Sequence, residues 1–102
     1  MREYDIFLPL YYNNGEPVDP RKFQALQKWI LDRFDGITAF PQPNKGIWRM
    51  ADVEYQDEIV IYRVIARRSK RIRSMFVKLK KKLMSAFGQE DILIVERNVQ
   101  IM

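Results

Sequence analysis

The sequence predicts a ferredoxin-like α+β fold with the element order βαββαβ. Two amphipathic segments of helical periodicity follow the first and third of four strand-like runs, which are rich in aromatic and β-branched residues. Right-handed crossovers would then place both helices on one face of a four-stranded antiparallel sheet. Because 102 residues suffice for one compact core and not for two, we expect a single ferredoxin-like domain over residues 1–102.

The first half of the chain supplies a strand, a helix and the start of a hairpin. Residues 4–12 form the first predicted strand, which ends at the turn signal Asn13-Asn14-Gly15. Asp19 followed by Pro20 is typical of a helix start and Gly36 of a helix end, which predicts a helix over about 20–35. A second strand is predicted to begin at residues 37–40. Two prolines interrupt it, and it continues at residues 47–50. Since proline cannot donate to a sheet ladder, we expect an edge strand or a bulge there.

The second half repeats this arrangement. A short turn at residues 51–53 predicts an antiparallel partner strand over 54–66. Ser69 is the expected cap of the second helix and Gly88 its end. The last strand is predicted from residues 92–95 and 99–101. The buried stripe of the second helix has helical spacing and comprises Ile72, Phe76, Leu79, Leu83 and Phe87.

Several predicted strands are apolar on both faces. In residues 59–66 one face carries three isoleucines, and the other carries Val60, Tyr62 and Val64. A strand side that faces water should be polar, and the two helices cover only one face of the sheet. We therefore expect a homodimer that forms through the uncovered face, or a ligand bound there. The five tyrosines fit either interpretation, as hydrogen-bonding groups in a cavity or in an interface.

Composition excludes several classes of site. The chain has no cysteine and no histidine, which removes thiol nucleophiles, thiolate metal sites and the commonest general base near neutral pH. We expect no cofactor and no metal. No uncharged apolar run approaches the ~20 residues of a membrane span, and the start of the chain lacks the apolar stretch of a signal peptide. A cytoplasmic protein without a membrane partner is the expectation.

A basic run is the first candidate functional feature. Residues 67–82 hold nine of the 18 basic residues and no acid, so the rest of the chain has nine basic residues against 13 acidic ones, a net charge of −4. Such a concentration suits binding to a nucleic acid or another polyanion, because each neutralised phosphate releases counterions. The alternative is a solvated helix face without a partner. The residues at the start of this run are the candidate contacts: Arg67, Arg68, Lys70 and Arg71.

The central hairpin is the second candidate. An arginine and a carboxylate on neighbouring strands can pair in two-pronged fashion and orient a small polar ligand. The alternative is an ion pair that only sets the strand register. A cofactor-free enzyme of the dimeric α/β barrel type would hold these side chains in one enclosed cavity. The candidate ligand-binding residues are Trp48, Arg49, Glu58 and Tyr62.

From Phe23 onward the chain contains a series of short sequence motifs. In order, they are Arg33-Phe34, Gly36-Ile37-Thr38, Gly46-Ile47-Trp48-Arg49, Glu58 and the segment from Phe87 to Leu93. With these motifs the chain resembles a family of small bacterial proteins known only as a domain of unknown function. The resemblance covers roughly the last three quarters of the chain and implies a fold and no reaction. We therefore expect a non-catalytic, dimeric binding or interaction module. A nucleic-acid-binding protein and a cofactor-free enzyme are the alternatives.

Overall fold

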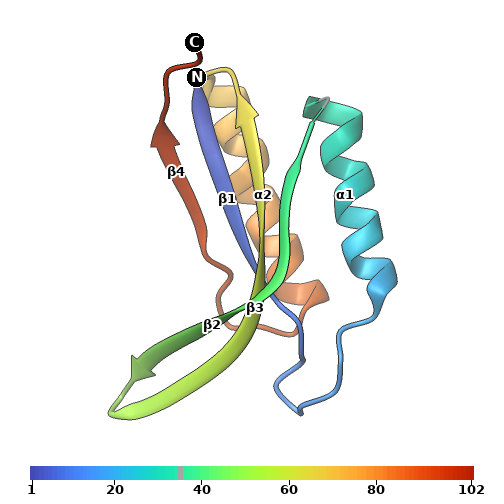
Figure 1. Ribbon diagram of the computed structural model, residues 1–102, viewed down its shortest axis with the longest axis vertical. Helices are drawn as coiled ribbons and strands as arrows, with labels where there is room; N and C mark the ends of the chain where they lie inside the picture. The colour runs from blue at the N-terminus through green and yellow to red at the C-terminus, as the bar shows by residue number, and fades with distance from the viewer. Residues whose placement is uncertain (35) are drawn as a thin grey trace.

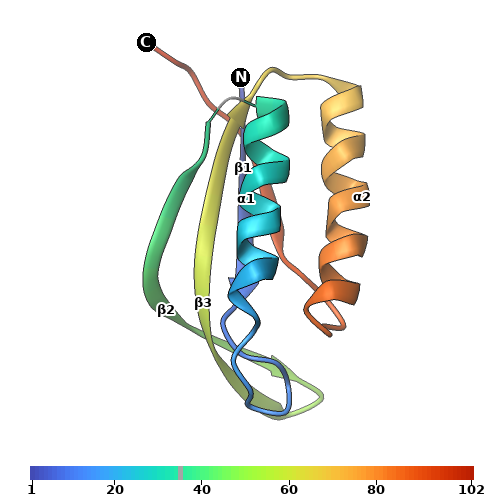
Figure 2. The same cartoon turned by 90° about the vertical axis from the view of Figure 1, so that its right-hand side faces the viewer.

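A computed structural model describes residues 1–34 and 36–102, and it describes only the backbone of residues 42, 43, 48, 50 and 55. The elements are β1 (Arg2–Pro9), α1 (Pro20–Phe34), β2 (Thr38–Met50), β3 (Val53–Ala66), α2 (Lys70–Ala86) and β4 (Ile94–Asn98). All neighbouring strands are antiparallel, and their order across the sheet is β2-β3-β1-β4. Both helices lie on the same side of this sheet (Figures 1 and 2). The predicted ferredoxin-like α+β fold is confirmed.

Both helices start where capping chemistry predicts. The carboxylate of Asp19 accepts the backbone N–H of Arg21 at 2.9 Å, and Pro20 occupies the first helical position of α1. The side chain of Arg21 also donates to this carboxylate, and that hydrogen bond lowers the pKa of Asp19 to about 2. The hydroxyl of Ser69 accepts the N–H of Ile72 at 3.3 Å at the start of α2. Beyond the end of α2, Gly88 adopts φ +60°, a left-handed conformation that glycine tolerates.

The core lies between the two helices and the side of the sheet that faces them. Ile6, Leu8 and Val64 on the sheet and Ile30 on α1 have no measurable exposure. Phe76 of α2 stacks on Tyr4 with ring centroids 3.9 Å apart. This aromatic contact fixes α2 against β1, which is one of the two central strands of the sheet.

The first and last strands differ from their predicted spans. β1 ends at Pro9, and the chain then forms a loop in which Tyr11 forms an isolated bridge with Pro17. Ile92 lies before the start of β4 at Ile94, and its side chain packs into the core with 2% exposure. After β4, Val99 makes one further backbone hydrogen bond, to the carbonyl of Met1. The hydrophobic pattern of the sequence is similar inside a strand and in the apolar residues next to it, so it did not mark where β1 and β4 end.

The β2–β3 hairpin is the longest element pair of the fold. Its register shifts between Phe40 and Asn44, at the prolines where an irregularity was predicted. Ala51 and Asp52 both have positive φ, at 48° and 64°, as a two-residue type I′ turn requires. The distal half of the hairpin extends past the ends of both helices (Figure 1). Among the described residues, no helix is long and apolar enough to cross a membrane.

Candidate functional site

The side of the sheet that carries no helix, called the open face below, is built from alternate residues of neighbouring strands. The register sets Asp5 of β1 opposite Arg63 of β3, then Phe7 opposite Ile61, so these side chains share one face. No described helix covers this face (Figure 2). It divides into a charged part near the chain's N-terminus and an apolar part beyond it.

The charged part, called the charged cluster, consists of Glu3, Asp5, Arg63 and Arg97. Arg63 donates to both carboxylate oxygens of Asp5, from Nε to Oδ1 at 2.8 Å and from Nη2 to Oδ2 at 3.0 Å. This two-pronged contact raises the pKa of the Arg63 guanidinium. Arg97 lies with its Nε 3.0 Å from Glu3 Oε2 and donates from Nη2 to Asp5 Oδ2 at 3.4 Å.

The burial of this cluster is unusual for an uncovered sheet face. The Asp5 side chain is 4% exposed and that of Glu3 is 10% exposed, although only the strands and the two arginines surround them. Glu3 Oε2 is buried and, despite the nearby Arg97, lacks a hydrogen bond of good geometry among the described residues. Two acids face two bases, so the cluster has no net charge.

The apolar part, called the open-face patch, continues directly from the charged cluster. Phe40 joins the two parts, because its ring lies 5.0 Å from the Arg63 guanidinium. Leu93 precedes β4 and lies beside Phe7, whose backbone N–H donates to its carbonyl at 3.0 Å. Leu93 and Phe40 are 53% and 37% exposed. The patch comprises Phe7, Pro9, Phe40, Ile59, Ile61 and Leu93.

The hairpin residues predicted as a ligand site are not brought together. Arg49 is paired with Glu54 and Glu58 with Lys45, so the two predicted partners are four residues, about 13 Å, apart along the strands. Both side chains are exposed. Tyr62 lies elsewhere, 5% exposed under α1, where its hydroxyl accepts a hydrogen bond from Gln27 at 2.7 Å.

The Trp48 side chain lies outside the described residues. The expected cross-strand pair of Arg49 and Glu58 is therefore not formed, because the hairpin register gives each a different partner. A ligand-binding role for these four residues stays a prediction.

The basic run forms the outward surface of α2 and the turn that precedes it. Arg67, Arg68, Lys70 and Arg71 are all exposed. Two other members of the run have acidic partners, Arg73 with Glu96 and Lys80 with Asp91. In the described part of the chain, the remaining seven have no ion pair: Arg67, Arg68, Lys70, Arg71, Lys78, Lys81 and Lys82.

The charged cluster was missed by reasoning from sequence. Glu3 and Asp5 are two residues apart on the first strand, which already places them on one face. Arg63 has the same parity as Ile59, Ile61 and Ile65, so the face called uniformly apolar contains a cation. The signal was available in the alternation, but only the strand register shows that the acids lie opposite the base.

Comparison with known proteins supports the fold. No protein-family model matches the chain, and no curated protein shows significant similarity to it. Among solved structures, a phage SAM lyase in complex with S-methyl-5'-thioadenosine superposes with a TM-score of 0.67 at 16% identity, covering 95% of this chain and 80% of that one. CutA1 from Pyrococcus horikoshii, solved as a point mutant, superposes with a TM-score of 0.63 at 12% identity, covering 100% and 86%. At such identities the likeness concerns the fold alone.

Proposed function

We propose that the protein is a non-catalytic interaction module that associates with a second copy of itself through the open face. The open-face patch is the observation that carries this proposal. Six apolar side chains are contiguous there on three strands and the segment before β4, and no described helix covers them. Phe40 and Leu93 are exposed and Phe7 and Ile61 half-buried, whereas Pro9 and Ile59 are buried between them. Contiguous apolar surface that water can reach marks interaction sites, because its burial removes it from water at about 25 cal/mol per Å².

The distribution of charge favours a second copy as the occupant. The chain carries +5 overall, yet the charged cluster beside the patch is neutral. The seven cations of the basic run without acidic partners lie on α2 and in the turn that precedes it, and α2 is on the opposite side of the sheet from the open face. Two copies can therefore approach through their open faces with little repulsion, whereas contact through α2 would set like charges against each other. A strongly acidic or basic partner would find no complementary charge on the open face.

The resemblance to a family of unknown function stays a prediction, since no family model matches the chain. A cofactor-free enzyme is less well supported. It requires Arg49, Glu58 and Tyr62 in one cavity, whereas the first two are exposed on the hairpin and the third is in the core.

The test is the oligomeric state of an open-face variant. Ile61→Asp places a charge in the centre of the open-face patch, and we expect it to convert an assembled protein into a monomer. Size-exclusion chromatography with light scattering at tens of micromolar measures this. Val77→Asp is the matched control, because Val77 is 48% exposed on α2 and its substitution should leave the assembly intact.

Phe40→Glu provides a second variant in case Ile61→Asp does not fold. Phe40 is on the edge strand β2 and is exposed, so its replacement should not disturb the core. Circular dichroism establishes that each variant is folded. A wild-type protein that is monomeric at tens of micromolar would contradict the proposal.

Binding of a nucleic acid along α2 is the second candidate function. The seven cations without acidic partners favour it, because ion-paired cations would not be free to neutralise phosphates. Fluorescence polarisation with short RNA and DNA tests it, and the affinity should fall steeply with salt. Charge reversal of Arg67, Arg68 and Arg71 should abolish the signal. Weak binding that hardly depends on salt would count against this candidate.

A further inference from the structure

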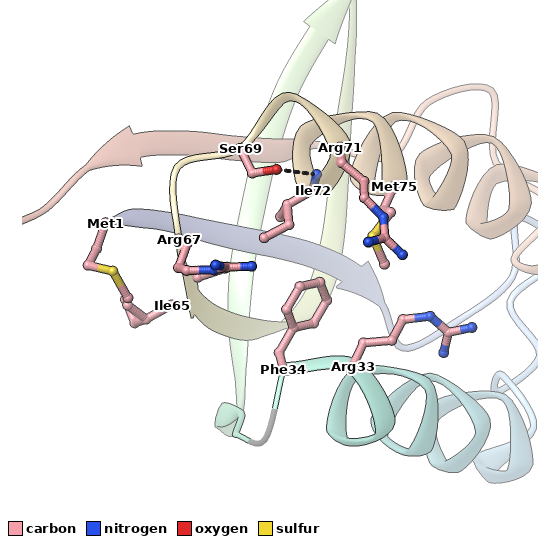
Figure 3. Close-up of a pocket in the computed structure, with 10 residues that line it drawn as sticks. Met1, Arg33, Phe34, Ile65, Arg67, Ser69, Arg71, Ile72 and Met75 are labelled. Carbon is pink, nitrogen blue, oxygen red and sulfur yellow. Dashed lines mark hydrogen bonds between the residues drawn. The ribbon is translucent and has the colours of Figure 1, made fainter.

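A cavity of about 530 Å³ lies where the end of α1 meets the start of α2. Figure 3 shows its lining: Arg33 and Phe34 project from α1, Arg67 from the turn after β3, and Arg71 and Met75 from α2. The volume falls within the range of small-molecule sites, about 300 to 1,000 Å³. This cavity is separate from the open-face patch, with which it shares no residue.

Three guanidinium groups from three different segments line the cavity. Arg33, Arg67 and Arg71 have no acidic partner among the described residues, and none of the ten lining residues is an acid. Arg33 is held in place, since its Nη1 donates to the carbonyl of Trp29 at 3.0 Å and its guanidinium lies 4.3 Å from the Trp29 ring. Guanidinium groups bind phosphate oxygens in two-pronged fashion, so three arginines without acidic partners around one cavity suit a multiply charged anion.

The backbone at the start of α2 adds a further donor. Ser69 satisfies the N–H of Ile72, but the N–H of Arg71, which lines the cavity, has no partner in the described part of the chain. The first turn of α2 contains no acid, although acids are the residues that the positive helix end favours. A bound anion would supply the missing negative charge.

The floor of the cavity is apolar. Phe34, Ile72 and Met75 line it, and the Phe34 ring is stacked on Phe76 with centroids 5.4 Å apart. Inorganic phosphate alone would leave this surface in contact with water. A ligand that also carries an aromatic or aliphatic group would cover it.

We infer that this cavity binds a small phosphorylated ligand with an aromatic or other apolar group. Arg33, Arg67 and Arg71 hold its phosphate groups, and Phe34 with Ile72 and Met75 contacts its apolar part. The inference concerns a site distinct from the open-face patch and goes beyond the self-association proposed above.

Isothermal titration with a series of related probes tests the site. We expect ATP to bind with a dissociation constant in the micromolar range, and adenosine and inorganic triphosphate each to bind about tenfold or more weakly. Adenosine that binds as well as ATP would overturn the role of the arginines. Triphosphate that binds as well as ATP would overturn the role of the apolar floor.

Matched variants distinguish the cavity from the general charge of α2. Arg67→Gln combined with Arg71→Gln removes two cations from the cavity and should weaken ATP binding about tenfold or more. Lys81→Gln combined with Lys82→Gln removes the same charge from exposed positions outside the cavity, and should change the affinity less than about threefold.

An equal loss of ATP affinity in the two double variants would contradict the cavity as the binding site. The absence of ATP binding at millimolar concentration would contradict it as well. Amide chemical shifts of residues 69–71 locate the site independently, since they should move on addition of ATP. Circular dichroism establishes that the variants are folded. Self-association of the same samples is measured separately, so the two proposals can fail independently.

Discussion

Asp5 is the residue on which the charged cluster most depends. Its carboxylate is almost fully buried, and moving an ionised group out of water is unfavourable unless charged partners and hydrogen bonds compensate. Arg63 provides two hydrogen bonds and Arg97 a third contact. Both arginines retain some access to water, at 34% and 52% exposure, which reduces the strength of each pair.

Asp5→Asn should therefore destabilise the fold by about 2 to 4 kcal/mol. The substitution removes the charge that holds Arg63 and leaves two cations beside a single carboxylate, that of Glu3. Urea denaturation followed by circular dichroism measures the change in the free energy of unfolding.

Asp91→Asn is the control for this prediction. Asp91 pairs with Lys80 but is 72% exposed, so its loss should change stability by less than about 1 kcal/mol. Equal stability of Asp5→Asn and the wild-type protein would show that the cluster does not stabilise the fold.

At the residue scale, sequence predicted the caps better than the site. Asp19, Ser69 and Gly88 act through neighbours within three residues, so local sequence suffices to recognise them. In the charged cluster, Asp5 contacts Arg63, 58 positions away in the sequence, and Arg97, 92 positions away. These contacts can be recognised only when the register of three strands is known. The expected pairing of Arg49 with Glu58 was wrong for the same reason, since a hairpin register depends on where its turn falls.

At the scale of elements, α2 carries charge that is unfavourable for its own stability. Its first turn contains Lys70 and Arg71 and no acid, so cations stand at the positive end of the helix dipole. Helix termini of this composition are retained at a cost in stability, which is consistent with a role in binding anions.

Lys70→Glu should accordingly stabilise the fold by about 0.3 to 1 kcal/mol, because it places a negative charge at the start of α2. Thermal unfolding at low ionic strength measures this as a higher melting temperature. Lys78→Glu makes the same charge change in the middle of the helix, away from the dipole's ends, and should raise the melting temperature less. An identical rise in the melting temperature of the two variants would mean that the effect comes from net charge alone.

The number, type and order of the elements could be predicted from sequence, whereas the ends of the outer strands could not. The helices combine amphipathic periodicity with caps, two signals that agree. The ends of β1 and β4 depend on which neighbouring residues pair across the sheet and which turn into the core, as Ile92 does. That choice is made by tertiary packing and not by local preference.

At the scale of the whole molecule, the two sides of the sheet carry different properties. One side bears the cationic helix and the arginine-lined cavity, and the other bears the neutral cluster and the apolar patch. Added salt should therefore weaken the proposed ligand binding without weakening the proposed self-association.

Raising NaCl from about 0.05 to 0.3 M should weaken ATP binding, because salt screens contacts between exposed cations and phosphate. Self-association should stay constant or strengthen, since salt screens the repulsion between two chains of charge +5. Titration calorimetry and light scattering on the same preparations measure the two responses. Self-association that is lost with salt would mean that ion pairs, and not the open-face patch, hold the copies together.

The register shift in β2 limits how large an assembly can grow. β2 and β4 are the two edges of the sheet, and an edge with unpaired backbone groups can recruit further strands into fibrils. Pro41 and Pro43 remove two N–H donors from β2 at the irregularity, and β4 is only five residues long and contains charged residues. Both edges of the sheet therefore disfavour the addition of further strands, so copies that associated through the proposed open-face contact would form a closed particle instead of a growing filament.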